Sequence, residues 1–456
     1  MFEQKKKFHF IGIGGIGMSG IAEILLAEGH LVSGSDRQQS EITDYLQSKG
    51  AEIYIGQDRT HVHAVDYCVF SSAVSPDNPE IQAAKEKGIP LVRRAEMLAQ
   101  LVNPKFNISV AGTHGKTTTS SMLGNVLIDA GFDPTIIVGG RLQKLKTNAR
   151  LGKSDYILCE ADEYDRSFLT LYPRIAIITS IEADHLDIYK DIDDLKHTFN
   201  RFANQVPYNG LIACCWDDPN IREILNNFYP SCYTYGLEPG ARFRAENIKF
   251  KETHTRFDVI ETDHFLGSIE LKSSGSHNVR NALGVVAVSS ALDIPFDTVA
   301  RSLNRFEGVQ RRFEIKGFFN DVMIVDDYAH HPTEVDTTIA AAKSGWDRRL
   351  VAIFQPHLFS RTKDFYKEFA EALKKADLVI VSGIYPAREQ PIEGVSGEMI
   401  TNHLKYLGHG HSYFVENRHD IPDFLNGKTE TGDMVLTMGA GNIWEIIEPI
   451  IKKIKA

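Results

Sequence analysis

Ala111-Gly112-Thr113-His114-Gly115-Lys116-Thr117-Thr118 is the stretch that decides the fold. The apolar run Asn107 to Ala111 precedes it, and a helical pattern follows it to about Ala130. A glycine loop at such a strand-to-helix junction cradles the phosphates of a nucleotide with backbone N–H groups, while its lysine neutralises their charge. The Thr117 hydroxyl is then placed to reach Mg²⁺. Although Val110 stands where the strict motif has a glycine, we predict an ATP-binding α/β domain here.

Acidic residues follow the next apolar run, Asp155 to Cys159. Glu160 ends that predicted strand, where a carboxylate beside a phosphate loop can bind Mg²⁺ directly or through water. Three more acids share its loop and are interpreted as a solvated face: Asp162, Glu163 and Asp165. His185 follows the run Arg174 to Thr179, but this position alone does not separate a ligand from a packed histidine.

A second glycine loop lies near the N-terminus, where Gly12-Ile13-Gly14-Gly15-Ile16-Gly17 follows the apolar run Phe8 to Ile13. It fits G-x-G-x-x-G, and Asp36 closes the next predicted strand about 20 residues on. Glycines let the backbone approach a diphosphate, and the following helix N-terminus offers unpaired N–H groups. The residues leave NAD and a UDP-sugar both open as the ligand.

Short apolar runs alternate with amphipathic stretches along the chain, which is typical of βαβ units. Asn103-Pro104 interrupts this pattern, and it restarts at Val322 to Val325 after the arginine-rich Gly308 to Glu314. Further strands are predicted at Leu31–Ser33, Tyr67–Phe70, Leu350–Phe354, Leu378–Val381 and Met434–Met438. We predict three α/β domains: a Rossmann-like domain at 1–103, a central P-loop domain at 104–309 and a Rossmann-like domain at 310–456. Gly139-Gly140 is predicted to form a turn.

Two polar motifs mark the predicted third domain. Asp326-Asp327-Tyr328-Ala329-His330-His331-Pro332-Thr333 ends a strand, with Pro332 suited to a helix start. The adjacent histidines favour a zinc site only weakly, because neighbours on a loop point apart. Gln355-Pro-His357-Leu-Phe-Ser-Arg361 also ends a strand and offers Arg361 to a carboxylate or phosphate.

The composition is that of a globular protein, with 456 residues, 43% hydrophobic and 24% charged. A net charge of -10 disfavours nucleic acid as a partner. The five cysteines form no C-x-x-C pair, which favours a reducing compartment. No apolar run approaches the roughly 20 residues that span a bilayer, and glycines interrupt the apolar stretch after the N-terminal lysines, unlike a secretion signal. We expect a cytoplasmic protein that binds no membrane and is a monomer or weak homodimer.

Together and in this order, these motifs resemble the Mur ligases over essentially the whole chain. The first glycine loop is similar to the family's UDP-binding loop and the second to its ATP loop. The L-alanine-adding member is the one most resembled, through Gly112 to Thr118, Glu160 to Glu163, Ser274-Gly-Ser-His277-Asn-Val-Arg-Asn281 and Asp326 to Glu334.

The resemblance implies roles for individual residues. Thr117 and Glu160 would hold one Mg²⁺ and His185 a second. His277 and Asn281 would contact the adenine side of ATP. The implied catalytic residues are Lys116, Glu160, His185 and Arg312, and Arg312 and Asp327 would contact ATP. The implied substrate residues are Gly14, Gly15, Ile16, Gly17, Asp36, Ser71, Ser72, Tyr328, His330, His331 and Arg361. Related ligases carry a carbamylated lysine after the magnesium histidine; none is assigned here, and Lys196 is the nearest candidate.

The implied reaction joins L-alanine to the lactyl carboxylate of UDP-N-acetylmuramate, with ATP and Mg²⁺ as cofactors. Phosphoryl transfer to the carboxylate precedes attack by the amine and loss of phosphate. A peptide-recycling ligase that attaches a tripeptide is the nearest alternative, although Glu334 and the context of Gln310 favour the alanine-adding member. Two alternatives come from other classes: an NAD-dependent oxidoreductase and a P-loop switch or binding module. The ATP loop argues against the oxidoreductase, and a carboxylate substrate site would argue against the switch.

Overall fold

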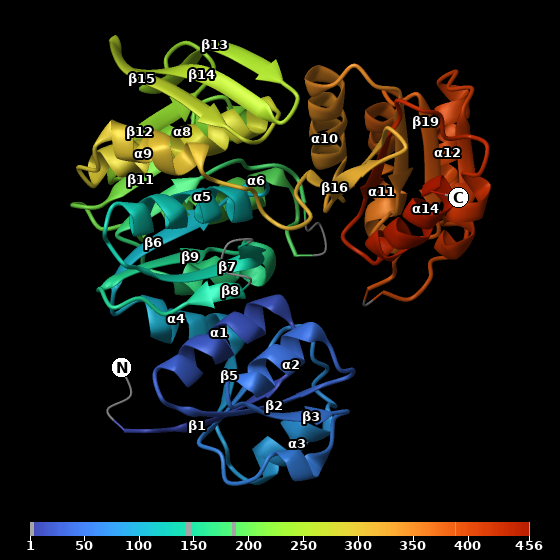
Figure 1. The fold of residues 1–456 in the computed structure, drawn as a ribbon. Helices are drawn as coiled ribbons and strands as arrows, with labels where there is room; N and C mark the ends of the chain where they lie inside the picture. Colours follow the sequence, from blue (N-terminus) through green and yellow to red (C-terminus); the bar gives the residue numbers. More distant parts are fainter. Residues whose placement is uncertain (1–3, 143–146, 185–187, 388, 456) are drawn as a thin grey trace. The chain divides into compact units, whose positions relative to one another are not determined.

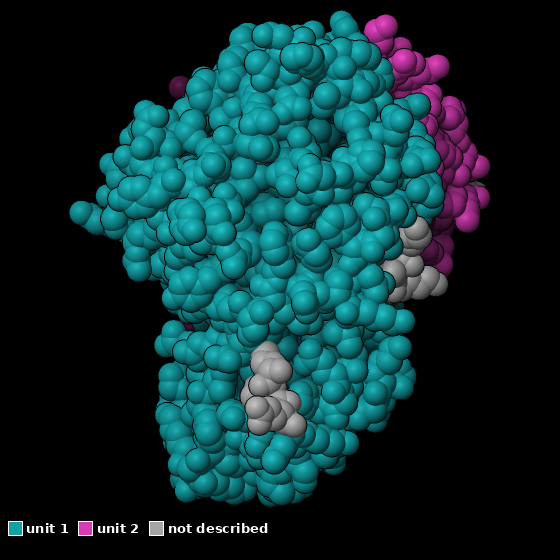
Figure 2. Space-filling model, turned by 90° about the vertical axis from the view of Figure 1, so that its left-hand side faces the viewer, with its two compact units in different colours: residues 1–248, 257–270, 278–307 teal, residues 249–256, 271–277, 308–456 magenta. Residues whose placement is uncertain are grey.

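The computed structural model describes residues 4–142, 147–184, 188–387 and 389–455. It is a mixed α/β structure with three sheets (Figure 1). The chain divides into two compact units, one of residues 1–248, 257–270 and 278–307, the other of residues 249–256, 271–277 and 308–456 (Figure 2). The first unit holds the first sheet and most of the second, and the other unit holds the third sheet. The domain boundaries expected after residues 103 and 309 remain predictions.

The first sheet has the order β3-β2-β1-β4-β5, and all its strand pairs are parallel. The strands are β1 (Lys7–Ile11), β2 (Leu31–Asp36), β3 (Glu52–Ile55), β4 (Tyr67–Phe70) and β5 (Leu91–Arg93). The helices are α1 (Ile16–Ala27), α2 (Glu41–Ser48), α3 (Pro79–Glu86) and α4 (Arg94–Val102). The strand order reverses between β1 and β4, so the loops after these two strands meet at the edge where open α/β sheets bind ligands.

The second sheet has ten strands in the order β15-β14-β13-β12-β11-β10-β6-β9-β7-β8. From β12 to β7 the pairs are parallel, and β8 joins β7 antiparallel. The strands are β6 (Phe106–Ala111), β7 (Thr135–Leu142), β8 (Thr147–Arg150), β9 (Tyr156–Glu160), β10 (Ile175–Ile178), β11 (Leu211–Cys215), β12 (Ser231–Gly236), β13 (Phe243–Lys251), β14 (His254–Glu261) and β15 (His264–Leu271). The helices are α5 (Lys116–Asp129), α6 (Ile192–Ala203), α7 (Pro219–Ile224), α8 (Ser276–Ala291) and α9 (Phe296–Asn304).

The third sheet has the order β16-β17-β21-β18-β19-β20, parallel except for the antiparallel pair β16–β17. The strands are β16 (Glu314–Phe319), β17 (Val322–Asp327), β18 (Leu350–Phe354), β19 (Leu378–Ser382), β20 (Ser412–Val415) and β21 (Met434–Met438). The helices are α10 (Pro332–Gly345), α11 (Phe359–Leu373), α12 (Glu398–Tyr406), α13 (Ile421–Phe424) and α14 (Ile447–Lys455). Apolar cores cover both faces of this sheet, as the continuous apolar strands predict.

The predicted fold class is confirmed, and the predicted strands are present, with ends that match or differ by at most three residues. Two local predictions are wrong. The first strand ends at Ile11 rather than Ile13, because Gly12 turns the chain with a φ of 78°. Gly139 and Gly140 lie inside β7 rather than in a turn. Among the described residues, no helix is both long and apolar enough to cross a membrane.

Candidate active site

The loop between β6 and α5 is built around two glycines. Gly112 has a φ of 135° and Gly115 a φ of 83°, conformations that other residues rarely adopt. A Cβ atom on Gly112 would lie 2.0 Å from the Thr179 hydroxyl, and one on Gly115 would lie 2.7 Å from Oδ1 of Asn281. Only glycine fits at either position. The loop ends at Gly115, and α5 begins at the next residue. Helix N-termini present N–H groups to anions, so the arrangement suits a nucleotide phosphate.

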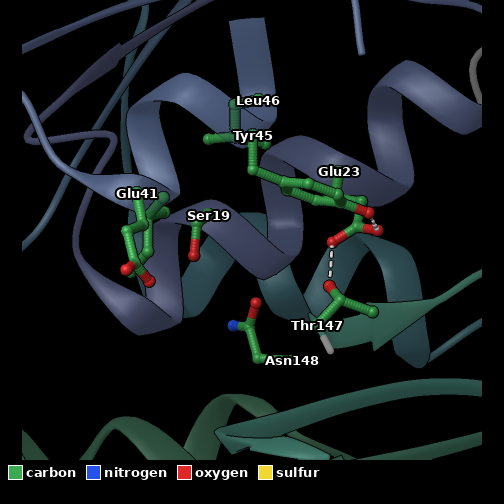
Figure 3. A pocket seen from close by; sticks show the side chains of 8 residues that line it. Ser19, Glu23, Glu41, Tyr45, Leu46, Thr147 and Asn148 are labelled. Carbon is green, nitrogen blue, oxygen red and sulfur yellow. Dashed lines mark hydrogen bonds between the residues drawn. The ribbon is translucent and has the colours of Figure 1, made fainter. Parts of the chain in front are cut away.

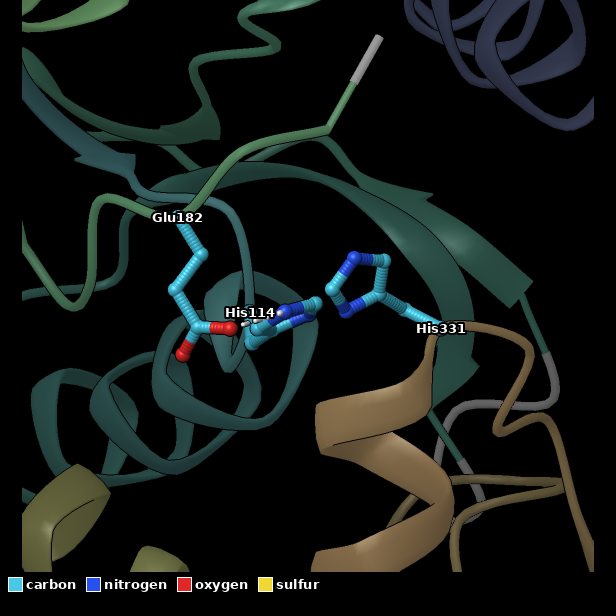
Figure 4. Close-up of side chains that lie close together, drawn as sticks. All are labelled: His114, Glu182 and His331. Carbon is cyan, nitrogen blue, oxygen red and sulfur yellow. Dashed lines mark ion pairs between the residues drawn. The ribbon is translucent and has the colours of Figure 1, made fainter. Parts of the chain in front are cut away.

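The same loop is attached to the segment that follows β10. The backbone N–H of Thr113 donates to the Ser180 carbonyl and that of His114 to the Ser180 hydroxyl, both at 3.0 Å. Glu182 donates its N–H to the Thr113 hydroxyl at 2.9 Å, and its carboxylate pairs with His114 at 3.5 Å (Figure 4). This segment leads to His185, which lies outside the described residues. These contacts therefore hold the phosphate loop against the segment that follows β10.

Lys116 opens α5 and folds its side chain back over the loop. Its ammonium donates to both carboxylate oxygens of Glu163, at 2.7 and 3.0 Å, and to the carbonyls of Gly112 and Thr113, at 2.5 and 3.3 Å. The side chain of Glu163 is only 2% exposed. The interpretation of Glu163 as part of a solvated face is therefore wrong. Asp165, in the same loop, is exposed.

Burial and charge act in opposite directions on this pair. Burial lowers the pKa of Lys116, but nearby carboxylates, Glu163 first among them, more than offset it and raise the pKa above its ordinary value. Burial raises the pKa of the Glu163 carboxyl to about 7, against the opposing effect of the Lys116 ammonium. The lysine is thus held as a cation inside the loop, as a phosphate-binding group must be.

Glu160 ends β9 next to Thr117. The Thr117 hydroxyl donates to Oε2 of Glu160 at 3.2 Å, so the two side chains present oxygen atoms at one place. The backbone N–H of Gly139 donates to Oε1 of Glu160 at 2.6 Å, and a Cβ on Gly139 would lie 2.7 Å from Oε2. Hydroxyl and carboxylate oxygens are donors that Mg²⁺ accepts, so the residues present fit this ion.

Gly139 is a site residue that the sequence reasoning missed. A glycine inside a strand marks a place where another group approaches the backbone closely, and here the group is the Glu160 carboxylate. The run of strand-forming residues Thr135 to Val138 just before the glycine pair is the signal that favoured a strand over a turn.

Lys196, the nearest candidate for a carbamylated lysine, is engaged by two carboxylates. Its ammonium lies 2.9 Å from Glu223 and 2.8 Å from Asp193, and these contacts raise its pKa. Carbamylation requires a neutral amine and creates an anion, and both are disfavoured beside two carboxylates.

The glycine loop after β1 is held by the end of β2. The N–H groups of Gly12 and Ile13 donate to the Ser35 carbonyl at 2.8 and 3.0 Å, and Gly14 donates its N–H to the Asp36 carboxylate at 2.9 Å. The Asp36 side chain is therefore used within the protein. Two further predicted residues, Ser71 and Ser72, directly follow β4, at the same edge of the sheet. The structure brings the predicted UDP-sugar residues together.

A cavity of about 210 Å³ is lined by residues of α1, α2 and β8 (Figure 3). The Tyr45 hydroxyl donates to Glu23 at 2.7 Å, Thr147 donates to the other carboxylate oxygen, and Asn148 donates to the Ile16 carbonyl. Burial, followed by the contact with Glu23, raises the pKa of Tyr45 to about 12. Strand β8 of the second sheet is thus fastened to the helix that follows the first glycine loop.

In the other unit, paired aspartates end β17. Asp327 accepts the backbone N–H groups of Phe313 and Ala329 at 2.6 and 2.7 Å and is almost fully buried. Burial raises its pKa to about 6, although Arg312 and the two N–H groups act against this rise. The carboxylate holds two backbone segments together, a structural use that the sequence did not predict.

The predicted substrate residues of this unit gather around Glu334. His330 lies 3.1 Å and Arg312 3.6 Å from the Glu334 carboxylate, and the Arg312 guanidinium lies 5.2 Å from the centre of the Tyr328 ring. Arg361, in α11, is buried. The cluster around Glu334 combines the Arg312 guanidinium, the His330 imidazole and an aromatic ring, which suits a small carboxylate-bearing ligand.

The adjacent histidines occupy different environments, as expected for neighbours on a loop. His330 faces the ring of His357 at 5.8 Å, whereas His331 faces Phe365 at 5.4 Å and occupies the N-cap of α10 (Figure 4). The His277 side chain lies against Gly275 at the start of α8, where a Cβ would be 2.5 Å from its ring.

Comparison with known proteins gives consistent matches along the chain. The model of the Mur ligase family catalytic domain matches residues 7–106, that of the Mur ligase middle domain residues 110–289, and that of the Mur ligase glutamate ligase domain residues 311–441. The UDP-N-acetylmuramate–L-alanine ligase of Geotalea uraniireducens is 49% identical, covering 100% of this chain and 99% of its own. That of Salinibacter ruber is 47% identical, covering 98% and 94%.

Two solved structures are also similar. The UDP-N-acetylmuramate-alanine ligase of Thermotoga maritima has a TM-score of 0.85 and 29% identity, covering 98% of this chain and 99% of its own. A murein peptide ligase of Psychrobacter arcticus has a TM-score of 0.75 and 26% identity, covering 99% of both chains.

Replacement of Gly139 tests the oxygen site. Gly139→Ala places a methyl group against the Glu160 carboxylate and should raise the Mg²⁺ concentration needed for half-maximal turnover by about tenfold or more, the usual cost of disturbing a group that orients a metal ligand. Steady-state turnover during a Mg²⁺ titration measures this. Gly410→Ala is the control, because no atom lies within 4 Å of a Cβ there. Unchanged magnesium dependence in Gly139→Ala would contradict the assignment.

The buried Asp327 predicts a pH effect on stability. Its pKa rises from 3.8 to about 6 on folding, so the folded protein binds this proton more tightly, and the stabilisation is lost as pH rises from about 4 to about 6. Asp327→Asn mimics the protonated form. Relative to this variant, the wild type should lose up to about 3 kcal/mol of unfolding free energy over that range, at about 1.4 kcal/mol per pKa unit, and none above it. Urea denaturation between pH 4 and 8 measures the difference, and a constant difference would refute the prediction.

Proposed function

This chain belongs to the Mur ligase family, and from that premise we propose that it joins L-alanine to the lactyl carboxylate of UDP-N-acetylmuramate, using ATP, in peptidoglycan precursor synthesis. The observation that carries the proposal is the full-length similarity to UDP-N-acetylmuramate–L-alanine ligases at 47–49% identity. Family membership also removes the oxidoreductase interpretation of the first glycine loop. The ligand of that loop is then the diphosphate of the UDP-sugar.

The geometry of the loop supports the proposed roles in the first unit. The loop from Gly112 to Thr118 binds the phosphates of ATP, and Lys116 stabilises the charge of the transferring phosphoryl group. Thr117 and Glu160 would hold Mg²⁺, which supplies further charge neutralisation when bound. Asn281 packs against the phosphate loop, which is consistent with a place near the nucleotide. His185 as a second magnesium ligand and His277 as an adenine contact rest on the family resemblance alone.

In the other unit, Arg312 and Asp327 would contact ATP. Tyr328, His330 and Arg361 would help to place the amino acid and the carboxylate that it joins. A planar guanidinium can form paired hydrogen bonds with a carboxylate, which suits Arg361 to this role. Tyr328, His330 and His331 would border the same ligand. Asp327 would also hold the segment before β16 against the loop after β17, since its oxygens accept N–H groups of Phe313 and Ala329.

The domain division and the cellular compartment are also proposals. We place the UDP-sugar domain at 1–103, the ATP domain at 104–309 and the amino-acid domain at 310–456. The five cysteines are free thiols, which supports a reducing, cytoplasmic location. The same acidic net charge of -10 supports the absence of nucleic acid among its partners.

The tripeptide-attaching ligase is the alternative that needs an experiment, because a murein peptide ligase shares the fold. Phosphate release should require ATP, UDP-N-acetylmuramate and an amino acid together, and L-alanine should give a higher kcat/KM than serine, glycine or the tripeptide. Lys116→Ala should reduce the rate by about 10²-fold or more, since it removes a charge-stabilising group at the phosphates. Faster phosphate release with the tripeptide than with L-alanine would overturn the assignment.

The two glycine loops predict separable binding defects. In Gly14→Val the new side chain would meet the Asp36 carboxylate at 2.8 Å and occupy space that a diphosphate needs. UDP-N-acetylmuramate should bind at least about tenfold more weakly, whereas ADP affinity should stay within twofold, roughly the effect expected of an independent site. Calorimetric titration of each ligand into both proteins measures this. Equal loss of both affinities would show that the variant damages the fold rather than one loop.

A further inference from the structure

The ammonium of Lys116 has no donor left for a phosphate. It carries three N–H bonds, and the structure surrounds it with four oxygen atoms within 3.3 Å, two from Glu163 and one each from the carbonyls of Gly112 and Thr113. A phosphate oxygen can therefore bind this lysine only by replacing one of these partners. The two carbonyls belong to the loop itself and are neutral. Glu163 is the charged partner, and it comes from a different segment.

Hydrogen bonds to its backbone carbonyl hold Glu163 in this position. The Tyr189 hydroxyl donates to the Glu163 carbonyl at 2.6 Å, and the Arg166 N–H donates to the same carbonyl at 3.0 Å. The two residues after Tyr164, Asp165 and Arg166, have φ angles of 55° and 52°, which non-glycine residues adopt at a cost. Arg166 also lies over the Tyr189 ring at 4.9 Å. Several contacts thus maintain an unfavourable turn that directs Glu163 toward the lysine.

We propose that Glu163 is the resident counter-ion of Lys116, which the phosphates of the nucleotide displace. Resting on the proposed ATP-binding function of this loop, the inference adds a positioning residue that controls nucleotide affinity. In the free protein Glu163 keeps the cation inside the loop. When ADP leaves, the carboxylate recaptures the ammonium, so the same residue assists product release.

The exchange has a thermodynamic consequence. A nucleotide binds fully only to the state in which Lys116 has left Glu163, so the observed affinity is reduced by the fraction of molecules in that state. Each phosphate also brings negative charge toward a carboxylate that is 2% exposed and poorly screened by water. Neutralising Glu163 should remove both effects and strengthen nucleotide binding. Most substitutions that disturb a binding loop weaken binding, so the sign of the effect is diagnostic.

Glu163→Gln is the direct test, because glutamine keeps the size and one acceptor but loses the charge. Titration calorimetry of Mg·ADP into the full-length protein at pH 8 should give a Kd about five- to tenfold lower than in the wild type, as expected when a competing state is removed. In the ligase assay the KM for ATP and kcat should both fall, because slower ADP release then limits turnover.

Asp165→Asn is the matched control. It makes the same carboxylate-to-amide change two residues away, in an exposed position where asparagine tolerates the positive φ. Its ADP affinity should match that of the wild type. An equal decrease of the Kd in both variants would mean that losing any nearby negative charge strengthens ADP binding, and it would overturn the proposal. Tyr189→Phe, which releases the Glu163 backbone without changing charge, should lower the Kd by about twofold and serves if Glu163→Gln does not fold.

Two other outcomes would also overturn the proposal. Weaker ADP binding in Glu163→Gln would mean that the carboxylate helps Lys116 to bind phosphate rather than competing for it. An unchanged Kd with a lowered melting temperature would mean that Glu163 only stabilises the fold. In a Lys116→Ala background the competition for the ammonium is absent, so Glu163→Gln should strengthen ADP binding less than it does in the presence of Lys116. Because ADP titration involves neither L-alanine nor the UDP-sugar, these results stand apart from the wild-type ligase assay, whose failure would count against the proposed function alone.

Discussion

The parallel register around β6 is the constraint on which the site in the first unit depends. Val110 pairs with Glu160 of β9, and Ala111 pairs with Ile178 of β10, so the phosphate loop emerges between an acidic strand end and the Thr179-Ser180 segment. Because all these strands run in the same direction, their carboxyl ends share one edge. A slip of one residue in the β6–β9 pairing would turn the Glu160 side chain to the other face of the sheet and separate it from Thr117.

Side chains pack closely against three glycines at this edge of the sheet. Gly112, Gly115 and Gly139 each lie where a Cβ would meet a functional or supporting side chain at less than 3 Å. The absence of a side chain at each glycine lets Thr179, Asn281 and Glu160 approach the backbone closely. Two of these glycines also adopt positive φ angles, so their requirement is both steric and conformational. The geometry of this edge therefore depends on the glycines as well as on the charged residues.

Candidate site residues could be predicted from the sequence where they follow a strand within a few residues. Both glycine loops, Glu160 and the Asp326–Thr333 motif could be assigned because each directly follows an apolar strand, and such strands are recognisable in one dimension. The role of Glu163 depends on how far the loop after β9 turns back toward Lys116. That turn contains Asp165 and Arg166 at positive φ, for which the sequence carries no glycine signal. The role of Gly139 was not predicted for a related reason, because its partner Glu160 is 21 residues away in sequence.

The distribution of charge explains how an acidic protein can bind anions. The net charge is -10, and three carboxylates at the phosphate loop, those of Glu160, Asp162 and Glu163, act on the Lys116 ammonium. Such a loop repels a bare triphosphate and suits one that arrives with Mg²⁺, because the ion neutralises phosphate and carboxylate together. The carboxylates also keep Lys116 protonated in a buried place, where burial alone would favour the neutral amine. The acidic surroundings thus maintain the cation and would favour a nucleotide that carries Mg²⁺.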